Sequence, residues 1–391
     1  MNSKIILSAA GLNKLFSYFA HNALLNKVSS VLVNRLILFL RYFIKKNDAH
    51  KVLVIVLHKI GDTVFTLHAI KKIQHIYGDS ISIICSNNTK VILEKCCANA
   101  EIFGVAVKDD FFFDRIAKPR VRKLVKEINP GIIIDITGNI KSATSILTAK
   151  ARIISGFNER KHFTNLYTHH VEKRSLPKLL DMYYDPLIAL HPLKITEEEK
   201  IFPVKLNPTG CILIHPFAGW NAKEWDYEKF IDLALKLNEK YNCKFVGEKS
   251  CFDLDHLNLL FEAKLEVIFT RDLSELLTLL ETSSLFISND SGPLYLANMM
   301  GKPTFTIYGP TNPLYSLPYG SYNRYIQNIV SCGPADIAQY CSTDAGRNGC
   351  KYYRCMHELA VQPVYDAVMK FINEKEIANQ NVEIKSNSYY S

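Results

Sequence analysis

The chain has 391 residues, of which 48% are hydrophobic and 22% are charged, and its formal net charge is +9. That length suffices for two or three domains with large cores, and the composition excludes a disordered or low-complexity protein. The positive charge is unevenly spread. Residues 1–50 hold seven Lys or Arg and one acid, which gives +6, so the rest of the chain shares +3.

Residues 1–50 form a basic segment with short apolar runs, for example 36–40. No uncharged run reaches the roughly 18–20 residues that a membrane-spanning helix needs, and no signal-peptide cleavage pattern stands out. A basic amphipathic segment can lie on an anionic membrane surface, and it can equally pack as helices on the body of the protein. Both interpretations stay open. We expect a cytoplasmic protein that is peripheral on the inner membrane.

From residue 51 onward, apolar runs of strand length alternate with segments of helical periodicity. The predicted strands are 51–57, 81–85, 102–105, 131–135, 153–156, 211–216, 244–247, 265–268, 285–288 and 303–308. The predicted helices are 64–77, 91–97, 121–128, 140 to about 150, 179–190, 227–241, 252–261, 273–281 and 294–300. This alternation is typical of α/β proteins with parallel sheets.

The series divides into two Rossmann-like halves. We predict a basic helical extension at 1–50, a first domain at 51–200, a second domain at 201–374 and a disordered polar tail at 375–391. Ligands of open α/β sheets bind outside the carboxyl ends of the strands. The cleft between the two halves is therefore the expected binding site.

The segment Ser288–Pro293 places an acid, Asp290, a hydroxyl, Ser291, and a glycine, Gly292, between a predicted strand and a predicted helix. Backbone N–H groups and the helix dipole at such a point suit an anion such as a diphosphate. The alternative is an ordinary turn in which Asp290 is the N-cap of the helix.

Gly61 and Asp62 stand in the same position after the first predicted strand. The glycine lets the backbone approach a ligand, and the carboxylate could act as a general base on a hydroxyl nucleophile. The alternative is again an N-cap aspartate. His58 and Lys59, which precede them, could contact an anionic substrate or be solvated.

The loop 215–225 holds both tryptophans of the chain together with Lys223. A lysine at the mouth of a Rossmann-like unit suits a diphosphate oxygen, although a surface lysine beside rim aromatics would look the same. Glu248 follows a predicted strand and could bind a ribose hydroxyl or cap the next helix.

Several common signatures are missing from the sequence. It has no P-loop motif, no Gly-x-Gly-x-x-Gly after the first strand, and no Asp-x-Asp loop of the kind that holds a metal in many sugar transferases. We therefore expect no metal ion and no cofactor.

Ten cysteines are present, and the last four, Cys332, Cys341, Cys350 and Cys355, are clustered. The spacing of the final pair is near the zinc-site rule. A structural metal and reduced, loop-packed thiols both stay open for this cluster.

Taken together, these motifs are more specific than any one of them. Five segments in the same order and spacing resemble the lipopolysaccharide heptosyltransferases, glycosyltransferase family 9: 54–62, 134–142, 215–225, 288–293 and 301–313. The likeness covers about 51–370.

The resemblance implies a GT-B fold with an acceptor domain at 51–200 and a nucleotide-sugar donor domain at 201–374. It implies transfer, with inversion, from a nucleotide-diphosphate sugar, typically ADP-heptose, to a lipid-linked oligosaccharide. By this resemblance Asp62 is the base and Lys223 neutralises the leaving diphosphate. The donor would be held by Asp290, Ser291 and Gly292, with Thr311 lining its pocket.

Acceptor contacts are expected from His58, Lys59, Asn139, Arg160 and Lys161. Arg160 and Lys161 belong to the basic stretch 158–174, which could meet a phosphorylated lipid acceptor. An anionic membrane surface is a further expected partner, and nucleic acid is not.

Two residues depart from the family pattern. Tyr295 stands where many members have histidine, and Phe217 replaces the glycine after His-Pro. Both changes leave open another nucleotide sugar such as a UDP-sugar, or a non-catalytic glycan-binding relative.

Overall fold

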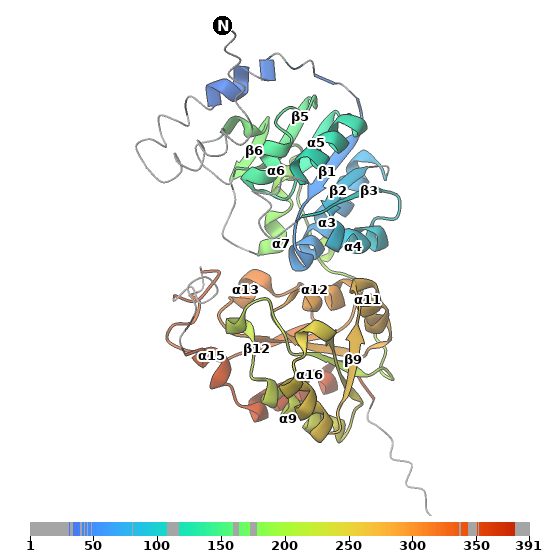
Figure 1. Cartoon of the computed structure of the whole chain (residues 1–391), viewed down its shortest axis with the longest axis vertical. Coiled ribbons are helices and arrows are strands. Elements are labelled where there is room, and N and C mark those ends of the chain that lie inside the picture. Colours follow the sequence, from blue (N-terminus) through green and yellow to red (C-terminus); the bar gives the residue numbers. More distant parts are fainter. Residues whose placement is uncertain are drawn as a thin grey trace, which may run out of the picture. The chain divides into compact units, whose positions relative to one another are not determined.

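A computed structural model describes most of the chain. The described residues are 31, 34–39, 41, 42, 44, 46, 47, 49–79, 81–107, 117–158, 164–172, 178–335, 338–342, 350 and 352–379. They form two compact units, drawn in Figure 1. The first unit contains 1–58, 69–173 and 183–193, and the second contains 59–68, 174–182 and 194–391.

The first unit is built on a six-stranded parallel sheet with the order β3-β2-β1-β4-β5-β6. Its strands are β1 (Val52–Val56), β2 (Ser82–Ser86), β3 (Glu101–Val105), β4 (Ile132–Asp135), β5 (Ile153–Asn158) and β6 (His169–Glu172). Its helices are α4 (Lys90–Cys96), α5 (Ala117–Ile128), α6 (Ile140–Ser145), α8 (Asp185–Ile188) and the second half of α3 (Ile60–Tyr77).

The second unit repeats this plan with the sheet order β12-β11-β10-β7-β8-β9. Its strands are β7 (Ile212–His215), β8 (Cys243–Glu248), β9 (Glu266–Thr270), β10 (Leu285–Asn289), β11 (Thr304–Tyr308) and β12 (Asn323–Gln327). Its helices are α7 (Leu179–Met182), α9 (Tyr227–Asn238), α10 (Leu254–Glu262), α11 (Leu273–Thr282), α12 (Gly292–Met299), α13 (Pro313–Ser316), α15 (Arg354–His357) and α16 (Val361–Lys375).

Both sheets are doubly wound, and this arrangement positions the candidate loops. In each sheet the strand order reverses between two central neighbours, β1 and β4 in the first and β7 and β10 in the second. The carboxyl ends of such neighbours form the topological switch point, where Rossmann-like sheets bind ligands. The loops after β7 and β10 therefore meet at one edge of the second sheet.

The central strands are buried because apolar side chains cover both faces. All five residues of β1, β10 and β11 are buried, as expected for parallel strands between helical layers. In the second unit, α9 and α16 lie side by side against one face (Figure 1). Their contacts with the sheet include Phe230 and Phe371.

The α/β prediction with two parallel sheets is confirmed, but some elements differ. The edge strands β6 and β12 and the helix α16 were not predicted, and 179–190 forms two short helices, α7 and α8. Most residues of β6 are exposed, so it lacks the apolar run that reveals a central strand. Ile377 is fully buried, so the packed part of the chain extends beyond the predicted boundary at 374.

Part of the N-terminal extension packs on the first unit. Residues 34–39 are helical, and Ile37, which is 3% exposed, belongs to the core of that unit. Leu36, Leu38 and Phe39 are exposed on the same helix. Within the described part of the chain, no helix combines the length and the hydropathy needed to cross a membrane.

A buried aspartate organises the loop that follows β4. The Asp135 carboxylate accepts hydrogen bonds from the Thr137 N–H at 3.0 Å and the Tyr167 hydroxyl at 2.7 Å. Thr137 in turn accepts from the Leu57 N–H at 2.9 Å, which fixes the chain after β1. Gly138 turns the loop with φ +65°, where a Cβ would lie 2.4 Å from Phe157. The 134–142 motif is therefore a scaffold for two loops.

We predict that Asp135→Asn changes the pH dependence of stability. Burial raises the pKa of Asp135 to about 6, against the opposing effect of its hydrogen bonds. A raised folded-state pKa means that the native protein is stabilised by this group below pH 4 and loses that stability as the pH rises through about 6. The variant, measured by urea unfolding, should gain about 2–3 kcal/mol relative to the native chain between pH 4 and pH 7.

The matched control for this measurement is Asp79→Asn, which removes an exposed carboxylate of the same unit. If Asp79→Asn and Asp135→Asn change the pH dependence of stability equally, the burial of Asp135 is not the cause of that change.

Candidate functional site

A largely buried ion pair in the second unit joins the loops after β7 and β10. The Lys223 Nζ lies 2.6 Å from the Asp290 Oδ2, and the Tyr295 hydroxyl donates to the Asp290 Oδ1 at 2.6 Å. The Lys223 side chain is 17% exposed and that of Asp290 is 3% exposed. Each oxygen of a nearly buried carboxylate thus has a donor, which meets the requirement for burying a charge.

Lys223 retains N–H groups that can donate further hydrogen bonds in this arrangement. An ammonium carries three N–H donors, and the ion pair with Asp290 uses one of them. The Trp220 ring lies 4.8 Å from the Lys223 Nζ, in a cation–π contact. Asp290 and Trp220 therefore hold the ammonium in place, and its remaining donors can bind an anion.

Neutral hydroxyls surround Asp290. Burial, and then repulsion by the Asp290 carboxylate, raise the pKa of both Tyr295 and Tyr308. Both tyrosines therefore stay protonated. Tyr295 acts as a hydrogen-bond donor, which is the role its position beside a carboxylate requires.

Asn289 locks the two loops together. Its Oδ1 accepts from the Trp225 backbone N–H at 3.1 Å, and its Nδ2 donates to the Pro216 carbonyl at 2.6 Å. Trp225 is buried, and its indole N–H donates to the Leu359 carbonyl at 2.9 Å. The position of Lys223 between Pro216 and Trp225 is therefore fixed at both ends.

The first half of α3 packs against this group. A Cβ on Gly61 would lie 2.9 Å from the Tyr295 ring, and one on Gly292 would lie 3.3 Å from Ile60. The Phe65 and Tyr295 rings are 4.6 Å apart. The two glycines allow this close approach, so the Gly61-Asp62 turn lies beside the residue that hydrogen-bonds Asp290.

Asp62 and Asp290 are not the N-caps that the alternative interpretations expected. Asp62 lies in the first turn of α3, half-buried, and Ser291 occupies the N-cap position of α12. Tyr315, in α13, has its pKa raised by burial and then by the negative charge of Asp62. Asp62 is therefore within electrostatic range of the loop that follows β11.

Of the five buried hydroxyls in the second unit that stay without a hydrogen-bond partner among the described residues, two lie in the loops after β10 and β11. They belong to Ser291, before α12, and Thr311, after β11. A buried unsatisfied polar group costs about 1–3 kcal/mol. A ligand that brings oxygen atoms to these hydroxyls would recover that energy.

His215, at the end of β7, adds no positive charge at neutral pH. Burial lowers its pKa to about 4, and its ring packs against Phe286 and Phe217. Phe217 in turn packs on Phe252, with ring centroids 4.8 Å apart. The residue that replaces the family glycine is therefore part of an aromatic cluster.

Other predicted site residues lie apart from this group. Glu248 is exposed at the end of β8. In the first unit, Asn139 accepts from the Ser142 N–H at 2.9 Å and so caps α6. Arg160 and Lys161 lie outside the described residues.

His58 and Lys59 fall on either side of the boundary between the two units. The His58 Nε2 is 3.2 Å from the Ile136 carbonyl, while Lys59 is exposed. The acceptor role that the sequence suggested for both residues stays a prediction.

The four late cysteines line one small cavity of about 10 Å³. Burial, and then the neighbouring thiols Cys341, Cys332 and Cys350, raise the pKa of Cys355 to about 11. Cys355 is thus a thiol at neutral pH. In the part of the chain that the structure describes, no group of three or more His, Cys, Asp or Glu is placed to hold a metal ion.

Comparison with known proteins shows which family this chain resembles. The family model described as "Glycosyltransferase family 9 (heptosyltransferase)" matches residues 120–342. The chain is 22% identical over 330 residues to "Lipooligosaccharide heptosyltransferase 2" of Campylobacter jejuni, a match that covers 81% of this chain and 97% of that protein.

Solved structures share the fold. A glycosyl transferase of family 9 from Veillonella parvula superposes with a TM-score of 0.66 at 18% identity, over 83% of this chain and 97% of that one. E. coli ADP-heptose lps heptosyltransferase II superposes with a TM-score of 0.60 at 17% identity, over 83% of this chain and 99% of that one. These likenesses support the GT-B arrangement of two Rossmann-like sheets. A third neighbour, TibC of E. coli, is described as an iron-containing dodecameric glycosyltransferase, with a TM-score of 0.53 at 13% identity over 84% of this chain and 78% of that one.

We predict that Tyr295→Phe destabilises the second unit through Asp290. The variant keeps the ring against Gly61 and Phe65 but removes the donor to the Asp290 Oδ1. A hydrogen bond to a charged group contributes about 1.5–3 kcal/mol, so urea unfolding should show a loss in that range. Tyr308→Phe is the matched control. It removes a buried hydroxyl whose partners are the neutral hydroxyls of Ser316, at 3.3 Å, and Tyr295, so its loss should be smaller. Equal losses would contradict a specific role for the Tyr295 hydroxyl.

Proposed function

Because the chain belongs to glycosyltransferase family 9, the heptosyltransferase family, we propose that it transfers a heptose from ADP-heptose onto a lipopolysaccharide core or a related lipid-linked acceptor. The transfer inverts the anomeric configuration and uses no metal ion. The enzyme works in the cytoplasm, as a peripheral protein on the inner membrane. The lipid-linked acceptor lies in that membrane.

One observation supports this proposal above the others. The Lys223–Asp290 ion pair lies at the switch point of the second sheet, and the Gly61-Asp62 turn packs against Tyr295, the second donor to Asp290. A positive group for a leaving diphosphate and a carboxylate for a nucleophile thus come from one connected set of contacts. Sugar transfer from a nucleotide diphosphate needs these two groups.

In the proposed mechanism Asp62 is the general base. It takes the proton from an acceptor hydroxyl as the oxygen forms a bond to the anomeric carbon of the donor. The bond from that carbon to the diphosphate breaks on the opposite face, so the configuration inverts and ADP leaves. The second product is the glycosylated acceptor.

Lys223 stabilises the charge that develops on the diphosphate. A preorganised cation in a site shielded from water is worth more than the same cation in water. The Ser291 and Thr311 hydroxyls, which are buried without partners among the described residues, can donate to the same phosphate oxygens. Asp290 positions Lys223 in this scheme, while its spare lone pairs can accept from a sugar hydroxyl.

The absence of a metal ion from the reaction belongs to the proposal. Lys223 can supply the positive charge that a divalent cation provides in other transferases. The description of TibC as iron-containing makes a chelator a necessary part of the assay. Transfer activity that persists after dialysis against a strong chelator is the outcome expected here.

We predict that ADP stabilises the protein more than UDP, GDP or CMP does, and that ADP-heptose stabilises it further. Binding to the folded state alone raises stability by mass action, by about 2.7 kcal/mol at a hundredfold excess over the dissociation constant. Thermal unfolding with each nucleotide measures this. A selective rise in melting temperature with UDP would mean that the donor is a UDP-sugar and not ADP-heptose. A chain that shifts with none of them would be a non-catalytic relative.

We predict that Asp62→Asn lowers turnover by about 10²- to 10⁴-fold while keeping the ADP shift, since a general base contributes about that factor. Lys223→Met should lose the ADP shift. The control Lys249→Met removes an exposed lysine of the same unit and should keep both properties. Full turnover of Asp62→Asn would remove Asp62 from the mechanism.

A further inference from the structure

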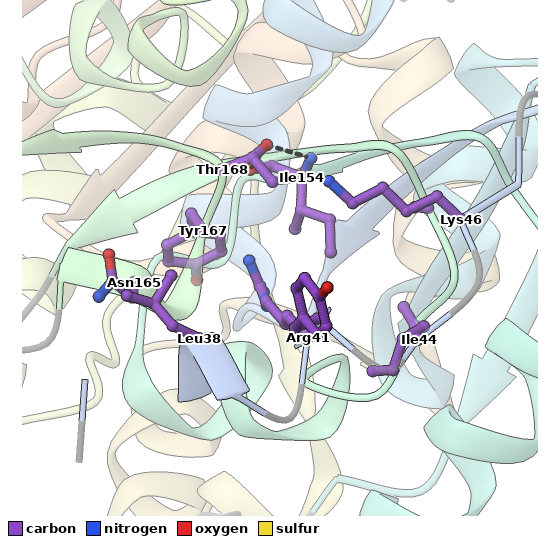
Figure 2. Close-up of a pocket in the computed structure, with 11 residues that line it drawn as sticks. Leu38, Arg41, Ile44, Lys46, Ile154, Asn165, Tyr167 and Thr168 are labelled. Atoms are coloured by element: carbon purple, nitrogen blue, oxygen red, sulfur yellow. Dashed lines mark hydrogen bonds between the residues drawn. The ribbon is translucent and has the colours of Figure 1, made fainter. Parts of the chain in front are cut away.

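A large cavity lies in the first unit and shares no residue with the site above. Its volume is about 680 Å³, within the range of roughly 300–1,000 Å³ that is typical of small-molecule sites. One wall comes from the N-terminal segment and the other from β5 and the connection to β6. Figure 2 shows the side chains of Arg41, Lys46, Ile154 and Tyr167 gathered around it.

The lining is apolar and carries positive charge. Leu38, Ile44 and Ile154 supply aliphatic surface, and Arg41 and Lys46 supply two cations. The lining contains no aspartate or glutamate. Among the described residues, no carboxylate forms an ion pair with either cation.

Arg41 is the more buried member of this pair. One of its terminal nitrogens donates to the Leu166 carbonyl. Its Nε is buried and finds no partner in the described part of the chain. Burial lowers the pKa of the guanidinium, because a charge removed from water without a counter-ion is disfavoured. An anion that enters the cavity would relieve this cost.

The N-terminal segment itself cannot supply that anion. Residues 1–47 contain seven Lys or Arg and no acid. Insertion of any part of this segment would bring no carboxylate to Arg41. Because no carboxylate among the described residues pairs with Arg41, an anionic ligand can supply the counter-charge.

The surroundings indicate what the rest of the ligand is. Leu38, Phe39 and Tyr42 are 54%, 60% and 85% exposed on the segment that borders the cavity. An apolar cavity beside exposed apolar side chains and two cations suits a molecule with an acyl chain and an anionic headgroup. An amphipathic segment with such a composition is typical of protein that meets a lipid surface.

We propose that this cavity binds an anionic phospholipid, with the phosphate at Arg41 and Lys46 and an acyl chain along the wall formed by Ala149, Ala151 and Ile154. The site is separate from sugar transfer and would hold the first unit at an anionic membrane.

The test measures lipid binding by the full chain, without nucleotide. Calorimetry with lysophosphatidylglycerol below its micelle concentration gives affinity for a single lipid. Flotation with phosphatidylglycerol vesicles, against phosphatidylcholine vesicles, gives affinity for a bilayer. Glycerol 3-phosphate serves as the headgroup without a chain. The buffer holds about 0.15 M salt, which screens exposed charges over about 8 Å.

Two variants separate the charge from the apolar wall. Lys46→Glu reverses an exposed cation of the lining, and Ala149→Phe fills the cavity. Each should weaken lysophosphatidylglycerol binding about tenfold or more. Lys46→Glu removes one positive charge and adds one negative charge, and each of these changes alters binding about fivefold. Ala149→Phe takes up the space of the acyl chain. The control Lys126→Glu reverses an exposed lysine of α5 and should bind as the native chain does. Melting curves show whether each variant is folded, and Ala149→Leu replaces Ala149→Phe if the latter is not.

Three outcomes would overturn the proposal. Unchanged binding by the variant that fills the cavity at Ala149 would mean that the lipid contacts only surface charge. Equal losses of lipid affinity with Lys126→Glu and Lys46→Glu would mean that the affinity depends on net charge alone. Glycerol 3-phosphate binding as tightly as the lipid would mean a phosphate site with no place for a chain. These results leave the ADP measurements unaffected, so either proposal can fail alone.

Discussion

The ion pair between Lys223 and Asp290 is the interaction on which the candidate site depends. A buried carboxylate is costly unless it is paired and hydrogen-bonded, and Asp290 meets this condition with Lys223 on one oxygen and Tyr295 on the other. Each partner belongs to a different element. Keeping Asp290 satisfied therefore requires the loop after β7, the loop after β10 and the helix α12 to stay in register. The ion pair that we propose to serve catalysis also sets the local structure.

The helix α3 extends this constraint to the proposed base. Its first turn can approach Tyr295 because Gly61 has no side chain, and it meets α12 where Gly292 has none. Two glycines far apart in the sequence thus serve one contact. The Gly-Asp and Asp-Ser-Gly motifs are consequently two halves of one packing arrangement. A side chain at either glycine would push Asp62 away from the residues that hold Asp290.

The sequence predicted the parts of this arrangement that depend on local pattern. The apolar runs that became β1, β7 and β10 are strong signals because parallel strands are covered on both faces. The strands β6 and β12 carry exposed side chains at the sheet edges, and such a pattern resembles a loop. Partners separated by many residues, such as Asp135 with Tyr167 or Asn289 with Trp225, had no local signal. Their hydrogen bonds exist only once the sheets are formed.

The treatment of buried charge differs between the two units. Asp290 has a protein donor on each carboxylate oxygen. Its buried negative charge is therefore compensated before any ligand binds. Arg41 has a carbonyl as a partner but no carboxylate among the described residues, and its Nε is unsatisfied. The first pattern is that of a preorganised site, in which charges are held for a reaction. The second is that of a site completed by its ligand, because an anion that binds there would offset the cost of burying the Arg41 charge without a carboxylate partner. The chain thus combines a proposed donor site, whose buried charge is already paired within the protein, with a proposed lipid site, whose buried charge awaits an anion.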